Sequence, residues 1–132
     1  MDLTGLYQLL SGEATITALV GDRIEPIELS PGQTMPALTF KFVGGSSEPT
    51  FDTSGMQKRR VELNAYGSSA LSADQVRTAV VKFLNGPWRV ELADGSYLDS
   101  FELIAPLDFP EPDARRFRCM VELYAFFNFP SS

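Results

Sequence analysis

Apolar residues recur at two different spacings along this chain, and each spacing predicts a different element. Between residues 3 and 10 they fall at positions i, i+3, i+4 and i+7, which predicts a short amphipathic helix that Ser11-Gly12 can close. Residues 13–20 repeat this spacing in a second short helix. The longest helical stripe, over residues 76–84, follows a capping box of Ser72 and Gln75 and ends at Asn85-Gly86-Pro87.

Strict alternation of apolar and polar residues predicts the strands. It begins after Pro36, and it returns over Lys58–Tyr66, so these two segments are expected to form a hairpin. The segment between them, Gly44–Gln57, is rich in glycine and serine and predicts a long exposed loop, in which Phe51 and Met56 are apolar residues suited to contact a partner. Ile24–Leu29, which contains a proline, is at best a short edge strand.

The last third of the chain predicts three more segments. Trp88–Ala93 and Ser96–Ile104 flank Asp94-Gly95, whose turn chemistry suits a two-residue hairpin. Pro106–Asp113, with its prolines and acids, is expected to be a stiff acidic connector, and Arg116–Phe127 alternates over its whole length as a final strand.

The predicted elements follow one another as helix, helix, hairpin, helix, hairpin and strand. This order is typical of an α+β protein. It predicts a mostly antiparallel β-sheet of about four to five strands with helices packed on one face. The chain has 132 residues, 44% of them hydrophobic, which is typical of a globular protein, and we expect residues 1–132 to form one domain.

The second face of this sheet is unusual. If Val61, Leu63 and their alternating neighbours cover the helices, the other face shows an aromatic and charged set: Tyr66, Met120, Tyr124 and Phe126 beside Glu62, Arg118 and Glu122. Two coverings are considered: the N-terminal helix folds across this face, or another subunit contacts it, since aromatic, Met and Arg side chains are enriched at interfaces. The residues favour the second.

Basic residues cluster where two strands begin, at Lys58-Arg59-Arg60 and at Arg115-Arg116 with Arg118. They are read either as charged strand ends that pair with local acids or as one side of an ion-pair belt between subunits. Nucleic acid is not expected as a tightly held ligand, because these bases lie among 17 acids in a chain of net charge −6.

Composition leaves little room for catalysis. The chain has no histidine and one cysteine, Cys119, which removes histidine-based nucleophile systems and the usual zinc sites. We expect no metal and no cofactor, no membrane segment and no signal peptide. Glu62 and Glu122, at equivalent strand positions, are the one candidate carboxylate pair, and nothing around them in the sequence predicts the apolar pocket that such chemistry needs.

Five blocks of sequence, in order, resemble the tail-completion or tail terminator (head-to-tail joining) proteins of long-tailed bacteriophages. They are LYQLLSGEATITALVGDRIEP, MPALTFKFVGG, FDTSGMQKRRVELNAYG, LSADQVRTAVVKFLNG and RRFRCMVELYAFF. The resemblance covers nearly the whole chain and is carried by apolar and turn residues, without a catalytic signature.

The resemblance implies a structural virion assembly protein and no enzyme. Such a subunit forms a ring, usually of six copies, that caps the tail tube in the tail-neck region of the virion, after assembly in the host cytoplasm. Its partners would be other copies of itself, the tail tube protein and a head-side connector or neck protein, with DNA only a passing duplex in the lumen. Two alternatives stay open: another neck or minor tail component of the same fold, and a small carboxylate-dependent enzyme or ligand-binding domain.

Overall fold

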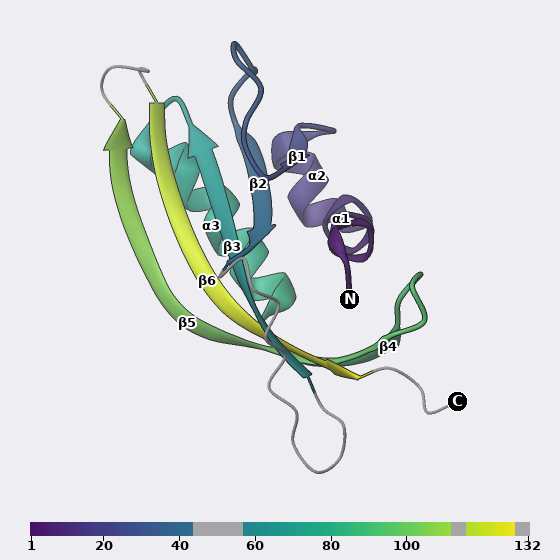
Figure 1. Cartoon of the computed structure of the whole chain (residues 1–132). Coiled ribbons are helices and arrows are strands. Elements are labelled where there is room, and N and C mark those ends of the chain that lie inside the picture. The colour runs from purple at the N-terminus through teal and green to yellow at the C-terminus, as the bar shows by residue number, and fades with distance from the viewer. Residues whose placement is uncertain (44–56, 112–115, 129–132) are drawn as a thin grey trace.

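The computed structural model describes residues 1–43, 57–111 and 116–128, with residues 105–111 described by their backbone alone. Within these ranges, three helices and six strands follow one another (Figure 1). They are α1 (Leu3–Ser11), α2 (Ala14–Val20), β1 (Ile24–Pro26), β2 (Ala37–Phe42), β3 (Gln57–Gly67), α3 (Ala70–Leu84), β4 (Gly86–Glu91), β5 (Tyr97–Glu111) and β6 (Arg116–Asn128). The predicted loop over 44–57 lies outside the described residues except for Gln57, with which β3 begins.

The predicted α+β class is confirmed, with one difference in strand number. The strands form one sheet in the order β1-β2-β3-β6-β5-β4, in which only the β1–β2 pairing is parallel. The sheet has six strands where four to five were expected. The additional strand is the edge strand β1, which is only three residues long and is held by backbone hydrogen bonds from Leu38 to Arg23 and from Ile27 to Phe40, each 2.9 Å.

The predicted acidic connector is wrong for residues 106–111, because β5 continues through them to Glu111. β4 pairs with β5 only as far as Phe101, so the rest of β5 borders β6 alone and forms an edge of the sheet. Proline lacks the N–H that a central strand needs, and an edge strand tolerates it. Pro106 and Pro110 are four residues apart, so their backbone nitrogens point to the same side of the strand.

Helix α3 begins one turn earlier than the capping box predicted. Its N-cap is Ser69, whose side-chain oxygen accepts the Ser72 backbone N–H at 3.1 Å. Gly67 at the end of β3 makes this start possible, since a Cβ there would lie 2.1 Å from the Ser72 hydroxyl oxygen and 2.5 Å from the Ala73 nitrogen. The predicted end of the helix at Asn85 is confirmed.

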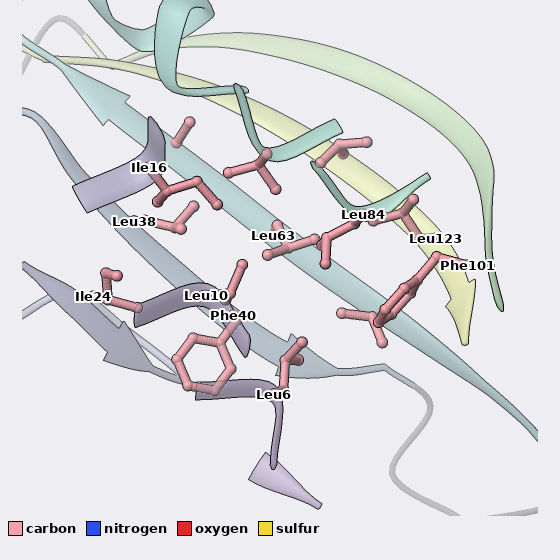
Figure 2. Packing of buried hydrophobic residues seen from close by; sticks show 14 of the residues in the cluster. Leu6, Leu10, Ile16, Ile24, Leu38, Phe40, Leu63, Leu84, Phe101 and Leu123 are labelled. Atoms are coloured by element: carbon pink, nitrogen blue, oxygen red, sulfur yellow. The ribbon is translucent and has the colours of Figure 1, made fainter. Parts of the chain in front are cut away.

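All three helices contribute to one apolar core on one face of the sheet (Figure 2). Leu6, Leu10 and Ile16 from α1 and α2, and Leu84 from α3, meet side chains of the strands such as Leu63 and Leu123, and each of these six is no more than 1% exposed. The reading in which the N-terminal helix covers the second face is therefore wrong. We call the covered side the helix-bearing face and the opposite side the open face.

Candidate assembly interface

The open face carries a row of charged residues across three neighbouring strands. Lys41, Glu62 and Glu122 are register partners on β2, β3 and β6. The Lys41 ammonium lies 3.3 Å from the Glu62 carboxylate, and the Asn64 amide donates to the same oxygen at 2.9 Å. Arg60 donates its Nε–H to Glu122 at 2.8 Å and forms a salt bridge with the same oxygen.

This row places the two candidate carboxylates directly opposite each other, as their strand positions predicted. Each is held by its own partners, Glu62 by Lys41 and Asn64 and Glu122 by Arg60. The hydrogen bond and the charge of Glu122 raise the pKa of Arg60. The arrangement is that of a cross-strand ion-pair network, in which one basic side chain beside each carboxylate offsets the repulsion between the two adjacent carboxylates. Lys41 is the member that the sequence reading missed, although alternation in both strands puts it on the face of Glu62.

Further along β3 and β6, on the same face, lies an aromatic and basic cluster of Lys58, Tyr124 and Phe126. Lys58 is the register partner of Phe126, and its ammonium lies 4.2 Å from the centroid of the Tyr124 ring. The two rings are 6.3 Å apart, and both side chains are only partly buried. Large aromatic rings that are half-covered in one chain can bury further area against a second one.

Arg59 does not belong to this cluster, which corrects the reading of Lys58-Arg59-Arg60 as one basic group. Successive side chains of a strand point to opposite faces, so Arg59 lies on the helix-bearing face between two residues of the open face. Its guanidinium stacks 3.6 Å from the centroid of the Phe42 ring and lies 3.5 Å from the Met1 carbonyl oxygen. Burial lowers the pKa of Arg59.

Tyr66 and Met120 were expected to be exposed on the open face, and this is wrong. They are 7% and 8% exposed. Both lie on central strands with a paired neighbour on each side, and the Arg116 guanidinium covers the Tyr66 ring at 4.9 Å from its centroid. Arg118, the register partner of Tyr66, is partly buried beside it.

The predicted interface residues thus fall into two separate groups. Because β3 and β6 are antiparallel, Lys58 and Arg60 lie beside the end of β6. Arg116 and Arg118 lie at its start, about 34 Å and about 27 Å from Phe126 at 3.4 Å per residue. Phe51 and Met56 lie outside the described residues. The role of all these residues in a contact stays a prediction.

Two further features bear on the kind of site. In the ranges 1–43, 57–111 and 116–128, no three histidine, cysteine or acidic residues come close enough together to hold a metal ion. Over the same ranges no helix has both the length and the apolar character required to span a membrane.

The fold has two layers, a sheet and the helices that cover one of its faces. The other face carries ion pairs and half-buried aromatic rings, which is typical of a protein that acts by contact with other proteins. The chain belongs to the family of the tail completion protein gp17, whose model matches residues 4–128. It is therefore a structural tail or neck protein of a bacteriophage, as the resemblance implied.

Comparison with solved structures finds the same fold in a virion protein. The structure is similar to a chain of the virion of a native gene transfer agent particle, with a TM-score of 0.72 and 18% sequence identity over 94% of this chain and 92% of the other. No curated protein is similar enough in sequence to be matched to the chain.

Proposed function

We propose that this protein is the ring-forming subunit that caps the tail tube and provides the surface on which the head joins the tail. The observation that carries the proposal is the cluster of Lys58, Tyr124 and Phe126 on a face that no described helix covers. A tail component with such a face has an apolar and basic surface available for a second protein chain.

The proposed ring has six members, the number typical of the family that the chain resembles. A chain of 132 residues has a radius of gyration of about 14 Å and a body about 36 Å across. Six such bodies in contact leave a central hole of about one body diameter, whereas four leave about 15 Å. The larger hole suits the passage of a DNA duplex, and the net charge of −6 limits its adhesion to the wall.

The proposed partners follow from this position in the virion, at the end of the tail tube. The open face contacts either a neighbouring copy or the tail tube protein, and a head-side connector or neck protein docks on the finished ring. Phe51 and Met56 are proposed as additional contact residues. The ring forms during assembly in the host cytoplasm. The proposal gives it no enzymatic role, and the engagement of both open-face carboxylates in the ion-pair row supports this.

The experiment compares Tyr124→Glu with Gln8→Glu, which introduces the same charge at an exposed position of α1. Electron microscopy of purified protein with and without tail tubes, and light scattering after size exclusion, measure ring formation and capping. We expect Gln8→Glu to behave as the parent and Tyr124→Glu to stay folded while losing rings or capping, because it places an uncompensated charge in a contact.

A parent protein that stays strictly monomeric and does not bind tubes would overturn the proposal. Binding to a neck complex without any binding to tubes would instead support the alternative function, that of a neck or minor tail component of the same fold.

A further inference from the structure

The residue after the edge strand β1 has an unusual backbone. Ile27 has φ 74°, in the left-handed region that L side chains avoid and that is an outlier for a β-branched residue. Glu28 donates its N–H to the Pro26 carbonyl at 2.9 Å, so Ile27 is the central residue of a γ-turn of the rare type with positive φ. The strained turn presents an isoleucine that is 54% exposed.

The surrounding contacts hold this turn in place. Ile27 donates its own N–H to the Phe40 carbonyl at 2.9 Å. The Glu25 carboxylate accepts hydrogen bonds from the hydroxyl and the backbone N–H of Ser30 and from the Gln33 amide. These hydrogen bonds keep the pKa of Glu25 below its ordinary value, so the rim of the turn carries the negative charges of Glu25 and exposed Glu28. Ile27 is therefore an apolar knob with an acidic rim.

A groove of complementary character runs between α3 and the edge of β5. It encloses about 380 Å³ and is lined by Asp74, Arg77, Thr78, Val81, Lys82 and Leu103. Leu103 is 37% exposed because β4 pairs with β5 only as far as Phe101 and leaves it uncovered. Arg77 pairs with Asp74 at 2.7 Å, and exposed Lys82 adds a further positive charge at the rim.

The knob and the groove cannot meet within one chain, because they lie across the sheet from each other. β1 and β5 are separated by four strand spacings, or about 19 Å. Two different and complementary surfaces on opposite sides of a subunit make a head-to-tail contact, and such a contact generates a ring when its rotation closes.

We infer that Ile27 of one copy inserts into the groove between α3 and β5 of the next copy, with Glu28 facing Lys82 of that copy. The occupant is a second copy of this chain because knob and groove carry opposite charge and sit on opposite edges of the same sheet. The inference rests on the proposed ring and specifies which surfaces join its members.

The first experiment measures ring formation by light scattering for Ile27→Asp and Leu103→Asp, with Gln8→Asp as the matched control for added charge. Each of the two contact variants should weaken the ring about 30-fold, the effect of losing a residue at the centre of an interface, and the control should not. Circular dichroism shows whether each variant is folded.

A mixing experiment tests the head-to-tail geometry. Ile27→Asp keeps an intact groove and Leu103→Asp an intact knob. An equimolar mixture should therefore form a dimer that does not close, at concentrations where each variant alone, with its affinity weakened about 30-fold, stays monomeric. The doubly substituted chain should stay monomeric under all conditions. Glu28→Lys combined with Lys82→Glu in the same chain should restore at least tenfold of the affinity lost by either change alone.

Ile27→Gly separates the contact from the fold, because glycine adopts positive φ without strain. Its melting temperature should be unchanged or higher than that of the parent while its rings are weaker. Parent rings that persist in Ile27→Asp and Leu103→Asp would overturn the inference and leave the proposed function standing. A parent protein that forms no ring, alone or on tubes, would overturn both.

Discussion

The two faces of the central strands differ in what they do, although they are built from the same stretches of chain. On the helix-bearing face, Val61, Leu63 and Leu123 are at most 1% exposed and lie in a continuous core. One residue further along, Glu62, Glu122 and Tyr124 face the other way, with ion pairs and a partly buried ring. A step of one residue therefore separates a position that holds the fold from one available for assembly.

The physical difference lies in solvation. A fully buried leucine contributes about 1.5 to 3 kcal/mol because its apolar surface leaves water completely. An ion pair that stays in contact with water gains much less, since solvent screens the charges and two long side chains must be held in place. Substitutions on the helix-bearing face should therefore act on stability, and those on the open face on association.

The largest effect is expected for Leu63→Ala in the core. It removes buried methyl groups and leaves a cavity, which should lower the free energy of unfolding by about 2–5 kcal/mol. Urea unfolding followed by circular dichroism measures the change. A loss below about 1 kcal/mol would mean that the core closes around the gap and that the contrast between the faces is weaker than the structure shows.

Gly67→Ala should be the next most damaging change. The Cβ of the alanine would clash with both the Ser72 hydroxyl and the Ala73 backbone nitrogen, so the start of α3 must move. This should lower the free energy of unfolding by about 1–3 kcal/mol. Adding Ser72→Ala removes the hydroxyl but leaves the backbone contact, so the double variant should recover only part of the lost stability. Thermal unfolding of the single and double variants decides this, and full recovery would show that the backbone contact is harmless.

Glu62→Gln and Glu122→Gln test the open face. Both variants should fold, form rings and support infection in a phage complementation assay, because these carboxylates serve the ion-pair row. The fall in melting temperature should be small beside that of Leu63→Ala. Loss of infectious titre despite normal rings and normal tail binding would reopen the reading of this pair as a catalytic site.

The smallest effect is expected at Glu25, at the edge of the sheet. Ser30 and Gln33 lower the pKa of its carboxyl from 4.5, so the folded state binds a proton less readily than the unfolded one. Its contribution to stability is therefore present above pH 4.5 and is lost as the pH falls through the lower folded value. Unfolding of the parent and of Glu25→Gln between pH 6 and pH 3 should converge at the acid end, and parallel curves would contradict the assignment.

Most elements follow from local patterns, and the exceptions have physical causes. The spacing of apolar residues predicted α1, α2 and the long strand β6, because amphipathic periodicity alone decides which side of an element is buried. The cap of α3 was misplaced by one turn because Ser69 and Ser72 are both good capping residues, and only the close approach of Gly67 to the helix selects Ser69. The prolines of β5 suggested a connector because sequence does not reveal that this strand lies at an edge.

The sequence by itself determined the α+β class, the apolar stripe of each helix, the residues that alternate along the strands and the resemblance to tail completion proteins. Only the tertiary structure decided what these basic side chains contact, since the stacking of Arg59 on Phe42 and the covering of Tyr66 by Arg116 depend on strands distant in the chain. It also brought the knob at Ile27 and the groove at Leu103 to opposite sides of the molecule. Local spacing fixes which face a side chain takes, whereas strand order and register fix what it meets there.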